Sequence, residues 1–405
     1  MMLCRGTNTF NLAVTGVLHG LHHIYSIFLS PLNEEIRQYF GKASISAITS
    51  FKTTYLITFA LSNLLFGALS NKLSPKKTLL FGSLLNSLAI LGFTLVSPED
   101  FWVMHLLWMI SALGAGTYHP ISFALIMSSF PNKKGWAIGI NGIGGTIGLA
   151  LSPLITGVLS RTFKINWQQI SLVFVLLGVL SSLLVVFLFN DPEKRMDTCG
   201  TGKGPKRPDI SLKRSALLFI GFIFVASGLR EFVQWSIIDI SDFFLSKLNV
   251  NQIDASWCLF AMYLPGIVIQ PTIGAISDKY GRQKLAALSL SVYMVAIVLL
   301  TINSKSFLLV IFTIMGLGYT SSVPLIEAMV GDWTSQHLRA LVFGIMISTS
   351  IGIASVGPVL SGLIIDSNGG TLGAFKVCFL VLGGLAEIAV VIVTFSGLVV
   401  KKLHL

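Results

Sequence analysis

Residues 274–283 read GAISDKYGRQ, which combines two glycines with one acid and two bases. Residues 67–77 read GALSNKLSPKK and repeat this spacing 207 residues earlier. Each copy ends an apolar stretch, and the copies stand half a chain length apart. Such a repeat predicts a duplicated membrane protein whose halves are related by a pseudo-twofold axis, with a site between them.

The composition predicts a membrane protein. Hydrophobic residues make up 53% of the chain and charged residues 11%, whereas about one-quarter of a soluble domain is charged. A membrane span needs about 20 mostly apolar residues. Division of the chain at its polar clusters predicts about twelve spans, at 9–30, 44–70, 78–97, 101–127, 136–160, 166–189, 214–246, 254–277, 283–303, 306–329, 339–364 and 372–400.

The distribution of lysine and arginine predicts the topology. Loops assigned to the inside carry 19 of these residues and loops assigned to the outside carry 7. By the positive-inside rule both termini lie in the cytoplasm, and the chain crosses the plasma membrane an even number of times. The net charge of +11 therefore reflects topology, and we expect no nucleic-acid partner.

The first apolar stretch is interrupted by Asn8, Asn11 and Thr15, and no small-residue cleavage pattern follows it. We therefore interpret it as a retained first helix rather than a signal peptide. The four cysteines lie far apart and show neither a disulfide framework nor a metal-ligand spacing. We expect no cofactor and no redox chemistry.

Residues 190–213 separate the two halves. They contain prolines, glycines and many basic residues but almost no large apolar side chains, which is typical of a cytoplasmic linker. Glycines and prolines on either side correspond at offsets of 204 to 207 residues, as Pro153 does with Pro358. We therefore predict six-helix bundles at 1–189 and 214–405.

Twelve spans in two sets of six, a long basic central segment and the motif between the second and third spans of a half together resemble the major facilitator superfamily. GAGTYHP at 114–120 and GLHHIYSIFLSPL at 20–32 further resemble the fosmidomycin-resistance-like permeases. The resemblance implies an all-α membrane protein of twelve transmembrane helices in two six-helix bundles. It also implies a secondary transporter that alternates access to a central cavity, and we expect a monomer.

The resemblance implies that both motifs act at the inner gate. A carboxylate there can accept hydrogen bonds from the free N–H groups at a helix N-terminus. The second motif is complete, whereas in the first motif Asn71 replaces the acid, so its contact should be weaker. The gating residues are therefore Gly67, Asn71, Lys72, Gly274, Asp278, Lys279, Gly281 and Arg282.

Pseudosymmetry predicts the partners of the two motifs. Asp278 should lie at the start of the span 136–160, near Gly135 and Trp136. Asn71 should face the start of the span 339–364, near Arg339. In the alternative interpretation both loops are tight turns whose basic residues only maintain topology.

Small residues and prolines recur at three- and four-residue spacing in the fifth and eleventh spans. This spacing lets helices approach closely and bend. It partly resembles the antiporter motif of the family and slightly favours export, although helix packing explains it equally well. The predicted packing and hinge residues are Gly148, Pro153, Gly157, Gly357, Pro358 and Gly362.

Histidines within spans are the first candidates for substrate binding. His19, His22 and His23 lie about 15–21 Å from the inner end of the first span, near the bilayer midplane. At least one should contact substrate, and His19 or His23 could carry a coupled proton. Tyr118 and His119 precede Pro120 and are further substrate-binding candidates. In the alternative, some of these histidines are structural.

The seventh span carries Arg230, Glu231 and Gln234. Arg230 is the first choice for an anionic group of the substrate, Gln234 is a second contact, and Glu231 is a candidate proton carrier. Adjacent residues on a helix diverge by about 100°, so Arg230 and Glu231 should each have a partner elsewhere. The alternative is a bridge to the other half at the outer gate. Tyr319 suits a partly apolar substrate.

Other ionisable residues are weaker candidates. Lys52 can extend to the interface, Asp239 and Asp242 should reach outer water, and Glu387 has no assigned role. Glu327 and Asp332 should be solvated or cap a helix.

The leading hypothesis is a proton-coupled secondary transporter that exports a drug or metabolite. The alternative is uptake of an organic or phosphorylated anion, and a different class is a sensor that keeps the fold without transport. An intramembrane enzyme is disfavoured. The three histidines of the first span could ligate a metal, but no carboxylate lies near them in sequence, so we predict no metal site and no enzymatic activity.

Overall fold

The computed structural model describes residues 2–70, 72–130, 133–190, 214–334 and 339–403. Every regular element in these ranges is helical, which confirms the all-α prediction. Ten helical segments in the described residues are long and apolar enough to cross a membrane. With α3 (Ile45–Leu69) and α4 (Pro75–Phe93) they make the twelve predicted spans. Nearly all of the predicted linker, 191–213, lies outside the described ranges.

The N-terminal bundle contains the six spans up to residue 187. In chain order they are built from α1 (Met2–Ile27), η1 (Ser30–Leu32), α2 (Asn33–Tyr39), α3, α4, α5 (Phe101–Ala115), α6 (Tyr118–Ser129), α7 (Lys134–Thr162) and α8 (Trp167–Phe187).

The C-terminal bundle contains the other six. They are built from α10 (Arg214–Lys247), α11 (Gln252–Tyr280), α12 (Arg282–Leu299), η2 (Leu300–Ile302), η3 (Lys305–Phe307), α13 (Leu308–Asp332), α14 (Arg339–Ala354), α15 (Gly357–Ser367) and α16 (Leu372–Leu403).

Local sequence explains where several helices begin and break. Ser44 and Asn251 accept hydrogen bonds from backbone N–H groups in the first turns of α3 and α11, as N-cap residues do. Pro358 stands in the first turn of α15 and marks the break between α14 and α15, whereas Pro153 lies inside an unbroken α7. The two prolines therefore have different effects despite their equivalent positions in the repeat.

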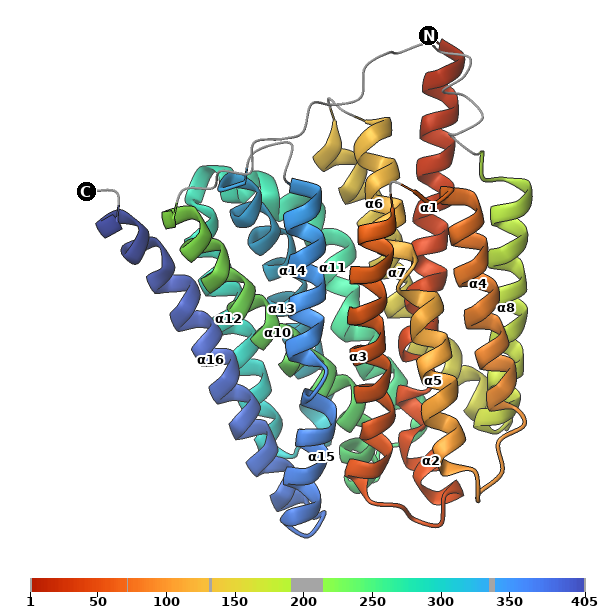
Figure 1. Ribbon diagram of the computed structural model, residues 1–405. Helices are drawn as coiled ribbons and strands as arrows, with labels where there is room; N and C mark the ends of the chain where they lie inside the picture. Colours follow the sequence, from red (N-terminus) through yellow and green to blue (C-terminus); the bar gives the residue numbers. More distant parts are fainter. Residues whose placement is uncertain (1, 71, 131–132, 191–213, 335–338, 404–405) are drawn as a thin grey trace.

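Two pairs of helices join the bundles. α7 packs against α11, and α3 packs against both α14 and α15. These pairs are equivalent under the repeat, because α3 corresponds to α11 and α7 corresponds to α14 and α15. Figure 1 shows the outer helices α4 and α8 of one bundle and α16 of the other at opposite edges of the molecule.

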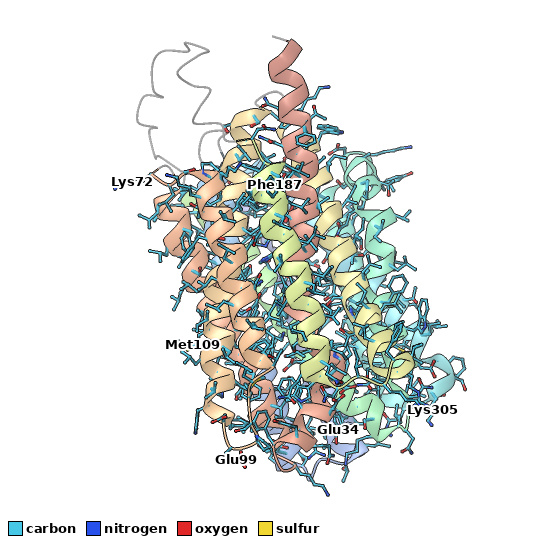
Figure 2. The ribbon with its side chains drawn as sticks, turned by 90° about the vertical axis from the view of Figure 1, so that its right-hand side faces the viewer. Glu34, Lys72, Glu99, Met109, Phe187 and Lys305 are labelled. Atoms are coloured by element: carbon cyan, nitrogen blue, oxygen red, sulfur yellow. The ribbon has the colours of Figure 1, made fainter. Side chains whose placement is uncertain are left out.

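The surface is apolar along the sides of the molecule and charged at its ends. In Figure 2, Lys72 lies at one end, Glu34, Glu99 and Lys305 lie at the other, and Met109 lies on the flank between them. Large exposed apolar side chains such as Leu176, with 66% of its surface accessible, line the helices. An apolar belt between charged ends suits a lipid environment.

The first and last helices start and finish at the same end of the molecule, as an even number of spans requires (Figure 1). This end is called the termini end below. The opposite end, where α2 lies, is called the far end.

Candidate functional site

A histidine cluster lies in the N-terminal bundle. α1 contributes His19, His22 and His23, and the start of α6 contributes Tyr118 and His119. The Nε2 atoms of His19 and His23 are 3.1 Å apart. The rings of His19 and His22 both stack on Tyr118, and His119 meets their edges. The structure therefore brings together all five candidates that the sequence proposed in this half.

The hydrogen bonds of the cluster are incomplete. The Nδ1 atom of His19 lies 2.8 Å from the backbone oxygen of Asn141. The Tyr118 hydroxyl donates to the backbone oxygen of Thr15 at 2.6 Å and lies 2.9 Å from Asn141 Oδ1. Within the described residues, the buried Nδ1 atoms of His23 and His119 have no hydrogen-bond partner. Because buried polar atoms are normally satisfied, these nitrogens are available to a ligand.

Glycines on α7 let α1 approach closely. A Cβ atom added to Gly144 would lie 2.0 Å from the backbone oxygen of Gly16, and one added to Gly148 would lie 2.1 Å from that of Gly20. A Cβ atom at Gly145 would lie 2.7 Å from the His19 ring. The predicted close approach at Gly148 is therefore a contact with α1, and it holds the histidines against α7.

In the C-terminal bundle, Arg230 and Glu231 of α10 form an ion pair. The Nη2 atom of Arg230 donates to Oε1 of Glu231 at 2.5 Å. The two residues therefore pair with each other, against the expectation of separate partners, because the long arginine side chain spans the angle between the two positions. Both also contact a residue elsewhere, Tyr319 of α13. Both residues belong to α10, so this ion pair does not join the two halves.

Tyr319 of α13 completes this group. Its hydroxyl donates to Oε1 of Glu231 at 3.0 Å, and its ring centroid lies 5.3 Å from the guanidinium carbon of Arg230. Among the described residues, the buried Nε and Nη1 atoms of Arg230 have no hydrogen-bond partner. These two donors lie on different edges of the guanidinium and each shares its edge with Nη2, so a carboxylate or phosphate that displaced Glu231 from Nη2 would meet an edge with two donors.

Gln234, the third candidate on α10, has partners of its own. Its Nε2 atom donates to the Tyr263 hydroxyl at 2.9 Å, and the Tyr293 hydroxyl donates to its Oε1 atom at 2.9 Å. The side chain is almost completely buried. Gln234 therefore joins α10 to α11 and α12.

Lys52 and Asp239 lie inside the molecule near the far end. The Nζ atom of Lys52 donates to the backbone oxygen of Ser26 at 2.5 Å and lies 4.9 Å from the centroid of Trp108. Asp239 accepts a hydrogen bond from Nδ2 of Asn33 at 3.2 Å. Both charged residues line one small cavity. The expectations that Lys52 extends to the interface and that Asp239 reaches water are wrong, because both are nearly fully buried.

Asp242 is also buried rather than solvated. Its Oδ2 atom accepts a hydrogen bond from the backbone nitrogen of Glu34 at 2.8 Å. Asp239 and Asp242 therefore connect α10 of the C-terminal bundle to α2 of the N-terminal bundle. These contacts help to close the far end.

Asp366 makes a contact between the bundles that the sequence interpretation missed. Its two carboxylate oxygens accept hydrogen bonds from the backbone nitrogens of Ile45 and Ser46, at 3.0 and 2.8 Å. The end of α15 thereby caps the start of α3. At the equivalent position of the repeat, the Ser160 hydroxyl donates to Oε1 of Gln252 at 2.8 Å, without a charge. The repeat offset, applied to the outer loops, could have identified this pair.

The second motif makes its ion pairs within its own bundle. Arg282 binds Asp278 at 2.8 Å and also pairs with Asp332 of α13. The Asp278 side chain is 65% exposed. Gly281 has φ +92° at the boundary between α11 and α12, a conformation that glycine adopts readily. The contact predicted between Asp278 and the start of α7 stays a prediction.

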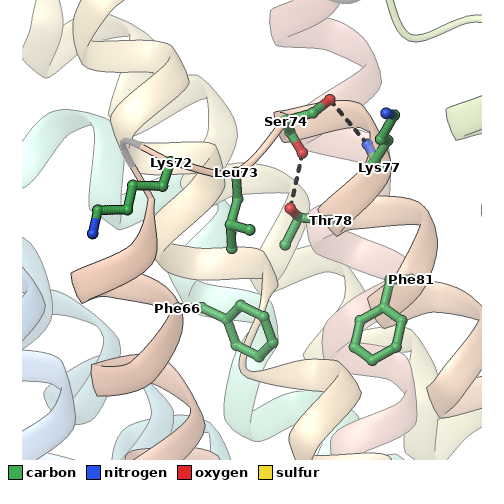
Figure 3. A pocket seen from close by; sticks show the side chains of 7 residues that line it. All are labelled: Phe66, Lys72, Leu73, Ser74, Lys77, Thr78 and Phe81. Atoms are coloured by element: carbon green, nitrogen blue, oxygen red, sulfur yellow. Dashed lines mark hydrogen bonds between the residues drawn. The ribbon is translucent and has the colours of Figure 1, made fainter.

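The first motif has a different turn. Ser74 caps α4 with Pro75 in its first turn, which explains why these residues replace the glycine and arginine of the second motif. Asn71 lies outside the described residues. A surface hollow of about 470 Å³ adjoins this turn, and Figure 3 shows Phe66, Leu73 and Phe81 beside Lys72 and Lys77. It lies away from the histidine cluster.

The remaining predicted packing residues lie at close helix crossings. Gly157 faces Ser256 of α11, and Gly362 faces Ser46 of α3, so both stand between the bundles. Gly357 faces Phe232 of α10.

Two further ionisable residues that the sequence marked lie outside these crossings. Glu327 is half-buried on α13, and Glu387 is exposed on α16.

Comparison with known proteins identifies the family. The family model of the Major Facilitator Superfamily matches residues 12–246 and 220–402. The riboflavin transporter RibZ of Clostridioides difficile is 26% identical, covering 68% of this chain and 71% of its own. The hexuronate transporter of Bacillus subtilis is 24% identical, covering 83% and 82%.

A solved structure has the same fold. A bacterial homolog of the human lysosomal transporter Spinster, in an inward-facing and unoccupied conformation, superimposes with a TM-score of 0.74. The two sequences are 15% identical, and the match covers 98% of each chain. The twelve helices in two bundles of six and the family match agree, and the chain belongs to the Major Facilitator Superfamily.

Proposed function

We propose that this transporter carries a small organic anion together with a proton by alternating access. The observation that supports the anion is the Arg230 guanidinium, which is buried and has two donors without a partner among the described residues. A fixed cation in a membrane domain is stable only with a counter-charge. Glu231 supplies that counter-charge in the unloaded protein, and an anionic substrate would replace it.

Proton coupling follows from this exchange. When a carboxylate or phosphate of the substrate binds Arg230, Glu231 loses its ion-pair partner in a buried site. An unpaired carboxylate there is costly, so Glu231 takes up a proton while Tyr319 keeps the side chain in place. Substrate and proton therefore bind together and move in the same direction, which favours uptake as the mode of transport.

Export of a drug or metabolite remains the alternative. It rests on the small residues and prolines of α7, α14 and α15, and the contact of Gly144 and Gly148 with α1 explains part of that pattern by packing. The relative named hexuronate transporter is consistent with a carboxylate-bearing substrate. The structure neighbour in an inward-facing conformation is consistent with closure at the far end, with the termini end in the cytoplasm.

Flux into liposomes tests this proposal. The purified protein is reconstituted, and uptake of sugar acids, other organic carboxylates and sugar phosphates is measured with and without a pH gradient of either sign. Arg230→Gln should lower the transport efficiency for the anion by about 10- to 100-fold, the value of a lost charge-assisted contact. Glu231→Gln should make uptake insensitive to the gradient.

Arg161→Gln is the matched control, because Arg161 is exposed at the end of α7. It should leave uptake unchanged. The anion proposal fails if Arg230→Gln transports as well as this control, or if only neutral or cationic compounds are carried. Exchange of protons against the substrate would contradict coupling in the same direction. A protein that binds an anion without flux would be a sensor.

A further inference from the structure

Three histidines from two helices present nitrogen atoms to one point. His19 and His23 come from α1 and His119 comes from α6, and each offers a ring nitrogen within 4.8 Å of the other two. His19 is buried, whereas His23 and His119 are partly exposed. The transport mechanism proposed above uses Arg230 and Glu231 and leaves this arrangement unexplained.

We propose that His19, His23 and His119 bind a divalent transition-metal ion such as Zn²⁺ or Ni²⁺. Neutral imidazole is a preferred ligand of zinc, copper and nickel ions. Three protein ligands leave at least one coordination position open, as in metal sites that bind a further ligand. It departs from the expectation of no metal site, because the fold adds His119 of α6 to the histidines of α1. The inference goes beyond the proposed function and does not depend on it.

The hydrogen bond of His19 prepares it as a ligand. A backbone carbonyl can only accept, so the 2.8 Å contact with the Asn141 oxygen places a proton on Nδ1 and a lone pair on Nε2. The Asn141 amide nitrogen lies farther from Nδ1, at 3.2 Å. Metal-binding histidines typically donate their second N–H to a carbonyl or carboxylate. His19 has that arrangement before any ion binds.

The spacing of the His19 and His23 nitrogens suits an ion, and His119 offers its nitrogen within 4.8 Å of them. Zinc lies about 2.0–2.1 Å from histidine nitrogen in tetrahedral sites, which puts two ligand nitrogens about 3.4 Å apart. The Nε2 atoms of His19 and His23 are 3.1 Å apart. For both atoms to ligate an ion, the proton of their mutual hydrogen bond must move from Nε2 to Nδ1 of His23, which has no partner among the described residues. Small rotations of the rings would then exchange that hydrogen bond for two bonds to the ion.

Bare backbone of α7 lies against one side of the histidine rings. Gly145 of α7 lies so close that a Cβ atom there would be 2.8 Å from His19 Nε2 and 2.9 Å from His23 Cδ2. The buried Nδ1 atoms of His23 and His119 have no hydrogen-bond partner among the described residues. A site with free nitrogens, packed against bare backbone, is more readily explained by a bound ion than by packing alone.

Metal binding in detergent solution tests the proposal without any transport assay. The full chain is purified through an affinity tag that lacks histidine and is treated with a chelator. Titration calorimetry with ZnCl₂ and NiCl₂ should show one saturable site per chain. His19→Ala, His23→Ala and His119→Ala should each weaken it by at least about tenfold, whereas His105→Ala should bind as the wild type does.

His105 is a suitable control because it lies outside the cluster, on α5, where it contacts Thr54. If the alanine variants do not fold, the visible absorption of wild-type protein with Co²⁺ reports nitrogen ligands directly. The absence of saturable binding, or of an imidazole-ligand spectrum, overturns the site. So does affinity that survives all three substitutions. Metal binding without flux would contradict the transport proposal alone. Flux without metal binding would contradict the metal site alone.

Discussion

Arg230 and Glu231 show what sequence can and cannot predict about single residues. Their position within an apolar span already marks them as functional candidates, because isolated charges are costly in lipid. Helical geometry places adjacent Cβ atoms about 100° apart, yet the two side chains meet. The reach and flexibility of a side chain decide such a contact, and backbone spacing does not.

The buried charges at the far end show a related limit. Lys52 and Asp239 look like interfacial residues in sequence because they lie near the ends of their spans. Their burial depends on the contacts of α10 with α2 and η1 at the far end. Only the tertiary structure creates these contacts. The sequence could therefore mark both charges but could not predict that they lie in one cavity.

Removal of the Tyr319 hydroxyl tests the support of Glu231. Tyr319→Phe keeps the ring beside Arg230 but leaves Glu231 with one partner fewer. A hydrogen bond to a charged group contributes about 1.5–3 kcal/mol, so we expect a destabilisation of this size in a denaturation series in detergent. Tyr280→Phe is the control, because Tyr280 is 60% exposed. Equal stability of the two variants would contradict the role of the hydroxyl.

A double-mutant cycle tests the charges at Lys52 and Asp239. Lys52→Met removes the cation from their shared cavity and should cost about 3–5 kcal/mol, because a buried carboxylate is left uncompensated. Asp239→Asn in that background should recover much of the loss. The unfolding free energies of both single variants and the double variant are measured in one detergent. Additive effects would show that the two charges do not interact.

At the scale of helices, the sequence predicted the spans and the small-residue stripes but not the partners of those stripes. Spacing alone shows that a helix can be approached closely. Gly148 meets α1 within its own bundle, whereas Gly157 and Gly362 meet helices of the other bundle. Which neighbour fills each groove depends on the packing of all twelve helices. The sequence also could not predict that His119 of α6 lies beside the histidines of α1, because only the fold brings these two helices together.

Gly148→Ala tests the contact between α1 and α7. The added Cβ atom would lie 2.1 Å from the backbone oxygen of Gly20, so the helices must separate, and overpacking typically costs about 1–3 kcal/mol. Gly142→Ala on the same helix is the control, because nothing lies within 4 Å of its Cβ position. It should be neutral or slightly stabilising, since alanine favours helix. Thermal unfolding in detergent distinguishes these outcomes, and similar shifts for both would count against a close crossing.

At the scale of the whole molecule, two carboxylates, Asp366 and Asp278, lie on helices that join the bundles, at opposite ends of the molecule. Asp366 belongs to the pair of α15 with α3 and binds across the interface at the far end. Asp278 belongs to α11, whose partner is α7, and lies at the other end with most of its surface free. The equivalent positions, Ser160 and Asn71, carry no charge. The motif revealed Asp278 in sequence, but Asp366 stands 321 residues from Ile45 and has no motif to mark it.

This diagonal arrangement predicts opposite effects of two similar substitutions. Asp366→Asn weakens a charge-assisted cap worth about 1–2 kcal/mol, so the closed far end should open in about 5- to 30-fold more molecules. If Asp278 caps α7 when the termini end closes, Asp278→Asn should instead favour the present conformation, and Asn71→Ala should do so far less.

Spin labels at Glu99 and Lys305, one in each bundle at the far end (Figure 2), report the separation by pulsed electron resonance. Ser160→Ala is the uncharged control for Asp366 and should shift the distances less. If Asp366→Asn and Asp278→Asn shift the distances in the same direction, the two carboxylates do not close opposite ends of the molecule. Equal shifts for Asp278→Asn and Asn71→Ala would contradict the special role of the charge at Asp278.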